Sequence, residues 1–139
     1  MTRSALSSSQ KQEMKILAID LGKSKVGLAI NYGMLAEPLE VIAREQLEQR
    51  LLELISEHTI TAILIGLPSG IMESEVEKFI ESFSRQISIP IFTADETLTS
   101  HQATLIKRNR PYAKRRLPDD AISAALILES WLELDEADE

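Results

Sequence analysis

Residues 15–30, KILAIDLGKSKVGLAI, constrain the fold most, because two short apolar segments there flank a turn that contains glycine. The first segment is aliphatic and partly β-branched, which predicts a strand buried on both faces. The connection is too short for a crossover, so the second strand should pair antiparallel with the first. Asp20 ends the first strand among apolar neighbours, where a carboxylate needs a cation, a hydrogen bond or a proton to offset its lost hydration. Asp20 is therefore either a turn residue or the anchor of a metal or phosphate site.

The pattern after residue 30 predicts a mixed α/β domain. A third strand is expected over 37–43, and Pro38 near its start indicates an edge position. Helical and strand patterns then alternate, with helices expected at about 44–58, 72–86, 99–107 and 119–134, and strands at 61–67 and 89–94. This order predicts a five-stranded mixed sheet, three antiparallel strands followed by parallel strands, with helices on both faces.

Length and composition place one domain over residues 15–134, between a disordered polar tail over 1–14 and an acidic tail over 135–139. The chain has no cysteine, which excludes disulfides and thiolate chemistry and suits a reducing compartment. No apolar run approaches the roughly 18–20 residues that span a bilayer, and the N-terminus lacks the apolar core of a signal peptide. We therefore expect a cytoplasmic protein with no membrane partner.

Acidic residues stand at the boundaries of the expected elements. Asp20 ends the first strand, Asp95 and Glu96 end the fifth, and Asp119 and Asp120 begin the last helix. The carboxyl ends of parallel strands meet at one edge of a sheet, so these acids should converge there. A divalent metal would relieve their mutual repulsion, and oxygen ligands suit Mg²⁺ or Mn²⁺. Two such ions could clamp the attacking water and the leaving oxygen of a phosphodiester.

Simpler interpretations exist for the same residues. An Asp at a strand end is often only a turn residue, and an Asp at a helix start can simply stabilise that terminus. Asp95 and Asp119 are the members of their pairs that we assign to structural or supporting positions. The spacing of Asp20, Gly22 and Gly27 also occurs in the phosphate cradles of actin-like and sugar-kinase ATPases. Those enzymes need two lobes, and this chain has the length of one.

A basic segment, KRNRPYAKRR at 107–116, directly precedes the last helix. The formal net charge is −7, but six of the 22 acidic residues lie within 129–139, so the local charge here is positive. The plain interpretation is a solvated loop; the functional one is contact with a nucleic-acid backbone and with an exposed base. The residues expected to contact nucleic acid are Lys23, Lys25, Lys107, Arg108, Arg110, Tyr112, Lys114, Arg115 and Arg116.

Five short motifs occur together in a fixed order. They are AIDLG at 18–22 with VGLA at 26–29, AEPL at 36–39, GLP at 66–68, DETLTS at 95–100 and DAISA at 120–124. The combination resembles the YqgF family, RuvC-like proteins of the RNase H fold that are described as Holliday-junction resolvases or pre-16S rRNA nucleases. The resemblance covers roughly residues 15–133.

The resemblance implies an RNase H-like fold and a metal-dependent endonuclease. By it, Asp20, Glu96 and Asp120 are the catalytic, metal-binding acids, with Mg²⁺ or Mn²⁺ as the cofactor. Gly22 and Gly27 then provide backbone clearance beside the site. The implied activity is processing of the 5′ end of pre-16S rRNA in ribosome biogenesis, or resolution of Holliday junctions in DNA recombination and repair.

Departures from the family pattern leave a further alternative open. Thr97 stands where the family usually has arginine, and the loop over 69–73 is shorter and more apolar. A catalytically weakened or purely nucleic-acid-binding member is therefore also considered. The expected partners are a structured rRNA precursor or branched DNA, which present the same phosphates, and a pre-ribosomal particle. A symmetric homodimer is expected for paired cuts at a junction, but not for trimming a single strand.

Overall fold

The computed structural model describes residues 6–22, 24–67, 73–95 and 119–134. The elements, in chain order, are α1 (Ser8–Gln12), β1 (Ile16–Leu21), β2 (Lys25–Tyr32), β3 (Leu35–Ala43), the 3-10 helix η1 (Arg44–Gln46), α2 (Leu47–His58), β4 (Ala62–Leu67), α3 (Glu73–Ser84), β5 (Ile91–Asp95) and α5 (Asp119–Glu133). The helix expected over 99–107 lies outside the described residues.

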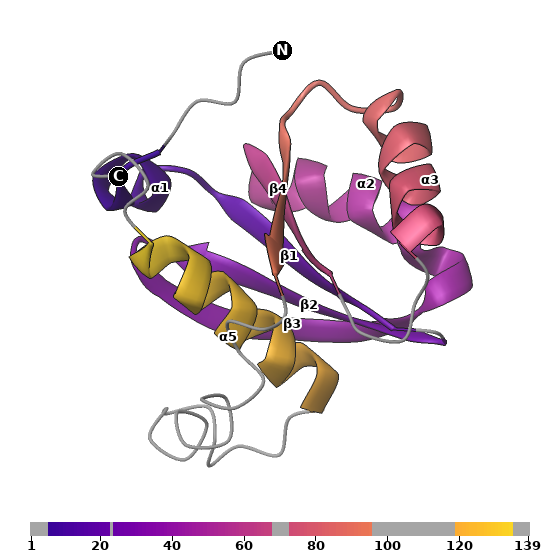
Figure 1. The fold of residues 1–139 in the computed structure, drawn as a ribbon, viewed down its shortest axis with the longest axis horizontal. Coiled ribbons are helices and arrows are strands. Elements are labelled where there is room, and N and C mark those ends of the chain that lie inside the picture. The colour runs from indigo at the N-terminus through magenta and orange to yellow at the C-terminus, as the bar shows by residue number, and fades with distance from the viewer. Residues whose placement is uncertain (1–5, 23, 68–72, 96–118, 135–139) are drawn as a thin grey trace.

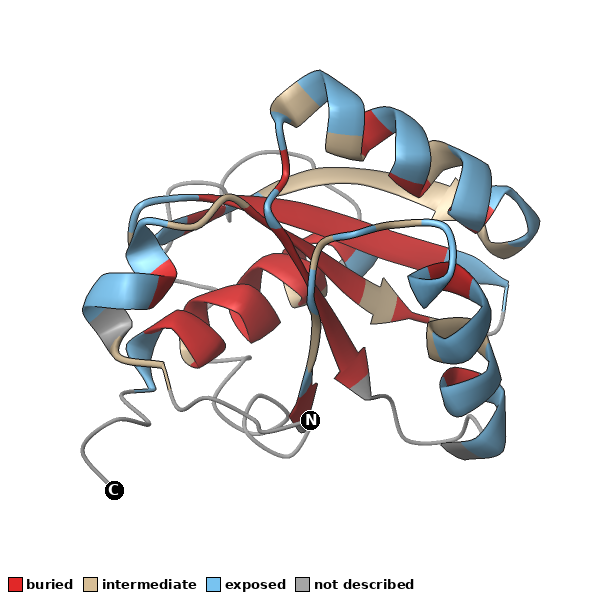
Figure 2. Cartoon of the chain, turned by 90° about the horizontal axis from the view of Figure 1, so that it is seen from above, coloured by how far each residue is buried: buried red, intermediate tan, exposed pale blue. Residues whose placement is uncertain are grey.

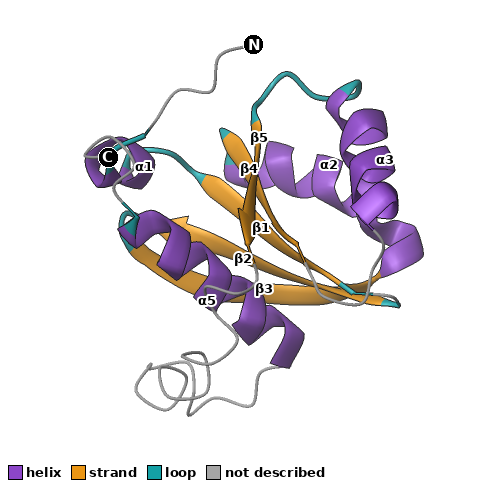
Figure 3. Cartoon of the chain, in the orientation of Figure 1, coloured by secondary structure: helices purple, strands orange, loops and turns teal. Residues whose placement is uncertain are grey.

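One sheet of five strands runs through the domain in the order β3-β2-β1-β4-β5 (Figure 1). The β1–β2 and β2–β3 pairs are antiparallel, and the β1–β4 and β4–β5 pairs are parallel. The predicted mixed sheet is therefore confirmed. Helices cover both faces, with α5 on one and α2 and α3 on the other (Figure 3). None of the described helices has the length and apolar character needed to cross a membrane.

Strand β1 lies at the centre of the sheet and is buried on both faces. Its residues alternate between two core clusters: Ile16 and Ala18 pack with α5, whereas Leu17, Ile19 and Leu21 pack with α2 and α3. A central strand covered on both faces reads as a continuous apolar run, which explains the pattern seen in the sequence. The one carboxylate in this strand, Asp20, sits at its exit.

Helix α5 is apolar on nearly all sides, and Figure 2 shows it buried along most of its length. It packs mainly against β1, β2 and β3, and its alanines allow a close approach to the sheet. An all-round apolar helix of this kind is expected only where the fold encloses it. Its N-terminal end, which begins with the two predicted acids, is thereby tied to the sheet.

The expectation of a disordered tail over 1–14 is wrong for the described part of that segment. Residues Ser8–Gln12 form α1, which begins with a capping box. Lys11 is fully buried, and its Nζ donates to the carbonyl oxygens of Trp131 at 2.9 Å and Leu134 at 2.8 Å. The same Nζ lies 4.1 Å from the centroid of the Trp131 ring. A cation at the carbonyl end of α5 satisfies groups that the helix leaves without partners, which gives this polar segment a reason to order.

Strand β3 is an edge of the sheet, as Pro38 predicts. Along the β2–β3 ladder, Leu28 pairs with Glu40. The next residue, Ala29, pairs with Pro38, which leaves Leu39 as an extra residue in a β-bulge. Proline has no N–H to donate, so a bulge on an edge strand is one of the few places where it fits.

Candidate active site at the carboxyl edge of the sheet

The carboxyl ends of four strands lie at one edge of the sheet. The parallel strands β1, β4 and β5 end there at Leu21, Leu67 and Asp95. Strand β3 ends at the same edge, because β2 reverses the direction between it and β1. Such an edge is where open α/β sheets build their sites.

Asp20 lies in a row of very small residues that crosses this edge. Its partner on β2 is Gly27, and its partner on β4 is Gly66, which in turn pairs with Ala94 on β5. Directly paired residues share a face of the sheet, and this row continues the face on which Ala18, two positions before Asp20, packs with α5. Small residues on either side leave room at that face for the start of α5.

The first turn of α5 rests directly on this row. A Cβ added to Gly27 would lie only 1.9 Å from the carbonyl oxygen of Asp120 and 2.9 Å from the main-chain nitrogen of Ala121. The helix therefore reaches the strand at the one position where no side chain stands between them. Because Gly27 pairs with Asp20, the same contact brings Asp120 to the level of Asp20. Gly27 thus leaves room for the main chain of Asp120 beside the strand position that pairs with Asp20.

The two acids differ in their surroundings. Asp20 is half-buried and Asp120 is exposed on the first turn of the helix. Carboxylate oxygens from a strand end and a helix start are hard ligands, so this pair fits a divalent cation such as Mg²⁺ or Mn²⁺. The third predicted ligand, Glu96, lies outside the described residues. Within the described ranges, no three acidic or histidine side chains gather closely enough to hold a metal, so the complete ligand set stays a prediction.

The supporting residues predicted around the site occupy element ends. Asp95 is the last residue of β5 and pairs with Leu67, while Asp119 is the first residue of α5. Gly22 serves the turn: its N–H donates to the carbonyl oxygen of Lys25 at 3.1 Å, and a Cβ on Gly22 would lie 2.4 Å from that oxygen. The absence of a side chain at Gly22 therefore makes room for the backbone of the β1–β2 hairpin, and not for α5.

Most of the predicted nucleic-acid contacts lie outside the described residues. The exception is Lys25, which is exposed at the start of β2 and therefore stands at the same edge as Asp20. Those not described are Lys23, Lys107, Arg108, Arg110, Tyr112, Lys114, Arg115 and Arg116.

A second cation at this edge, Arg44, escaped the sequence analysis. It follows the last residue of β3, and its Nη1 donates to the carbonyl oxygen of Gly22 at 3.3 Å. Its main-chain N–H donates to the carbonyl oxygen of Ser24 at 2.9 Å, and its Nη2 lies 3.7 Å from Oε2 of Glu75. The rule that identified the acids, namely the position at a strand end on the site edge, would also have identified this arginine.

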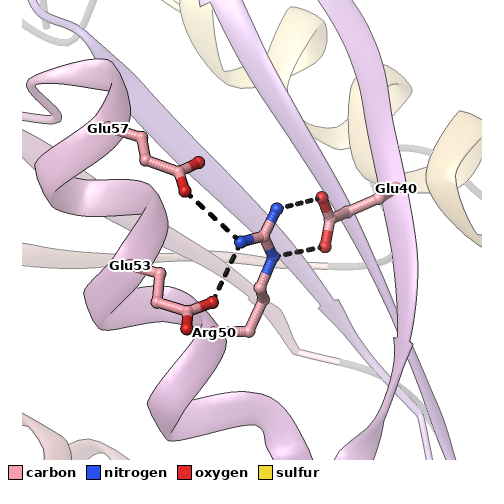
Figure 4. Close-up of polar contacts among 4 residues, drawn as sticks. All are labelled: Glu40, Arg50, Glu53 and Glu57. Carbon is pink, nitrogen blue, oxygen red and sulfur yellow. Dashed lines mark hydrogen bonds and ion pairs between the residues drawn. The ribbon is translucent and has the colours of Figure 1, made fainter.

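A separate group of charges lies between β3 and α2 (Figure 4). Arg50 donates to both carboxylate oxygens of Glu40, at 2.7 and 2.8 Å, and to Glu53 at 3.0 Å, with Glu57 at 3.7 Å. The hydrogen bonds that Arg50 donates hold the pKa of Glu40 below its usual value, and the acceptance of these bonds by Glu40 and Glu53 raises the pKa of Arg50. These carboxylates are already paired with a guanidinium, so the cluster joins a strand to a helix.

A surface cavity of about 350 Å³ opens beside the same cluster. Its lining consists of Glu40, Ile42, Gln46, Gln49, Arg50 and Glu53. Neither Asp20 nor Asp120, the two described acids predicted for catalysis, lines it. The cavity therefore belongs to the β3–α2 side of the domain, and the candidate site is the edge that holds Asp20 and Asp120.

Comparison with known protein families gives a match over residues 14–134, to the family model RuvX, described as Holliday junction resolvase. A relative from Desulforamulus reducens is 36% identical over 133 residues, covering 86% of this chain and 97% of its own. Another, from Natranaerobius thermophilus, is 32% identical and covers 86% of this chain and 94% of its own. Both carry the name "Putative pre-16S rRNA nuclease".

Solved structures share the fold at low sequence identity. Thermus thermophilus RuvC in complex with a Holliday junction substrate aligns with a TM-score of 0.61 at 15% identity, over 84% of this chain and 91% of that one. The fowlpox virus Holliday junction resolvase aligns with a TM-score of 0.58 at 14% identity, over 86% of this chain and 99% of that one. The RuvC-like, RNase H-like architecture expected from the sequence is thus confirmed.

Proposed function

Since this chain belongs to the RuvX family of Holliday junction resolvases, we propose that it is a metal-dependent nuclease that processes the 5′ end of pre-16S rRNA. The relatives that carry the pre-16S rRNA nuclease name align over nearly their whole length, which supports this substrate. The observation that carries the proposal is the contact of Asp120 with Gly27, the partner of Asp20. This contact supports the proposal, because it starts the helix that carries Asp120 on the residue that pairs with Asp20.

We assign catalysis to Asp20, Glu96 and Asp120. Asp20 shares its row of the sheet with Ala94. Glu96 is the third acid that the family resemblance implies, and it directly follows Asp95, the last residue of β5.

Each described residue contributes a distinct property to the site. Asp20 is half-buried at the end of a central strand, and Asp120, at the start of α5, would add a second carboxylate. Bound Mg²⁺ or Mn²⁺ would supply acidity to the attacking water and charge stabilisation to the leaving oxygen. Lys25, with Lys23 and the basic residues of 107–116, would hold the substrate backbone through its phosphates. The setting we propose is the cytoplasm, with a pre-ribosomal particle as partner.

Resolution of Holliday junctions is the second candidate function, because the family model carries that description. Paired cuts across a four-way junction require two active sites related by symmetry, so this function predicts a homodimer. Cleavage near a single 5′ end makes no such demand. The two candidates therefore differ in both substrate and oligomeric state.

The test is a side-by-side cleavage assay on a 5′-extended 16S rRNA precursor and on a four-way DNA junction, with Mg²⁺, with Mn²⁺ and with EDTA. We expect metal-dependent cleavage of the RNA at its 5′ extension. Cleavage of the junction alone, by a dimer, would support the second candidate. Binding of either substrate without cleavage under any condition would reject the nuclease and leave a nucleic-acid-binding protein on the same fold.

A further inference from the structure

We propose that Arg44 is a positioning residue that binds a backbone phosphate of the nucleic acid beside Asp20, an inference that rests on the function proposed above. Among the described residues, the cations at the site edge are Lys25, at the start of β2, and Arg44, directly after β3. These two positions are neighbours, since Lys25 pairs with Ala43. Arg44 is thus the described guanidinium closest in the fold to the strand end that carries Asp20.

Arg44 is anchored to the turn that follows Asp20. Its Nη1 donates to the carbonyl oxygen of Gly22, and its main-chain N–H donates to that of Ser24. These bonds hold the backbone of Arg44 and one edge of its guanidinium against the hairpin. A side chain that is already ordered loses little entropy when it binds a ligand, which is what a positioning residue requires.

The guanidinium keeps capacity for an anion. It has five N–H donors, and its side-chain partners among the described residues are one carbonyl oxygen and the carboxylate of Glu75. The Glu75 contact, at 3.7 Å, is longer than a hydrogen bond. The side chains of Arg44 and Glu75 are 29% and 53% exposed, so their attraction is weakened by solvent. A phosphate, which guanidinium binds in a bidentate manner, can therefore displace Glu75.

Glu75 should oppose nucleic-acid binding, whereas Arg44 should favour it. It lies in the first turn of α3, which begins at the site edge after β4. Its negative charge compensates Arg44 in the free protein and repels an incoming phosphate. Two substitutions should consequently shift nucleic-acid binding in opposite directions, which separates a phosphate contact from a purely structural role.

The experiment measures the Kd for a 5′-extended 16S rRNA fragment at several salt concentrations, together with kcat and KM. We expect Arg44→Ala to weaken binding about tenfold. It should also reduce the steepness of log K against log salt by about 1, which corresponds to the loss of one phosphate contact. KM should rise while kcat changes little. Arg44→Lys, which keeps the charge, should restore most of the salt slope, and Glu75→Gln should tighten binding.

Arg85→Ala is the matched control. Arg85 follows the end of α3, away from the site edge, and forms an exposed ion pair with Glu81 at 2.8 Å. Its removal should leave Kd and the salt slope unchanged. An unchanged slope in Arg44→Ala, or a loss of kcat with KM unchanged, would overturn the inference, as would a Glu75→Gln variant that binds more weakly. If the wild-type chain binds neither the RNA nor a four-way junction, the proposed function itself fails.

Discussion

The carbonyl oxygen of Asp120 occupies the space that a side chain on Gly27 would need, 1.9 Å from the ideal Cβ position. Gly27 is also the antiparallel partner of Asp20. A single glycine on β2 thus determines how closely the start of α5 approaches the sheet. The helix that carries Asp120 therefore begins on the residue that pairs with Asp20.

Gly27→Ala should therefore damage both the fold and the site. The added methyl group meets main-chain atoms, which cannot rotate away, so the start of α5 must move. We expect a loss of more than about 3 kcal/mol in the free energy of unfolding, at the upper end for overpacked cores, and a loss of cleavage. Gly66→Ala is the control: its Cβ would meet the end of the flexible Ile127 side chain at 2.7 Å. Urea denaturation should show a clearly smaller effect there, and equal effects would contradict the assigned role of Gly27.

Asp20→Asn should abolish metal-dependent cleavage while the protein stays folded. The amide has the size of the carboxylate but lacks the charge that a divalent cation requires. Initial rates should fall to those of the wild-type protein in EDTA, with an unchanged circular dichroism spectrum. Glu37→Gln, an exposed change on β3, should keep full activity. Wild-type rates in the Asp20→Asn variant would show that this acid does not hold the metal.

Lys11→Met should destabilise the domain by about 2–4 kcal/mol, because it removes a charged donor from two buried or partly buried carbonyl oxygens and from an indole ring. Lys15→Met is the comparison: its Nζ lies 4.2 Å from the centroid of the Tyr32 ring. That ring is half-exposed, so the cost should stay below about 1 kcal/mol. Equal melting temperatures for the two variants would argue against α1 as a cap of α5.

The Glu40–Arg50 contact should make stability depend on pH. The pKa of Glu40 is held below its usual value near 4.5, so its contribution is complete above that pH and is lost as the pH falls through the lowered pKa. Glu40→Gln should therefore be less stable than wild type at neutral pH, and the difference should vanish once the pH falls below the lowered pKa of Glu40. Glu37→Gln on the same strand is the control. A difference that persists in acid would mean that the charge of Glu40 is not its source.

Much of the fold could be predicted because the relevant signals are local. The run over 15–30, the proline of the edge strand and the alternation of helix and strand together led to the observed sheet. The segment that forms α1 could not be predicted in this way. It is short and polar, and its order depends on Lys11 meeting α5 across more than 100 residues of sequence.

The site could be predicted to the extent that topology determines it. The start of α5 lies against Gly27, the partner of Asp20, as expected if one strand end and one helix start meet at the same edge. The position of Arg44 directly after β3 could have been identified by the rule used for the acids, but its contacts with Gly22 and Glu75 could not, because they depend on the register of β3 and the placement of α3. Glu96 and the basic segment lie outside the described residues, so their roles stay predictions.

The bulge at Leu39 and the missing N–H of Pro38 have a consequence for self-association. An exposed edge strand is a template on which another extended chain can add, the route by which sheet proteins grow into fibrils. Strand β3 offers an interrupted and kinked row of donors and acceptors, flanked by the carboxylates of Glu37 and Glu40. A second molecule would find no continuous ladder there. The longest strand of the sheet is therefore a poor template for strand addition and fibril growth.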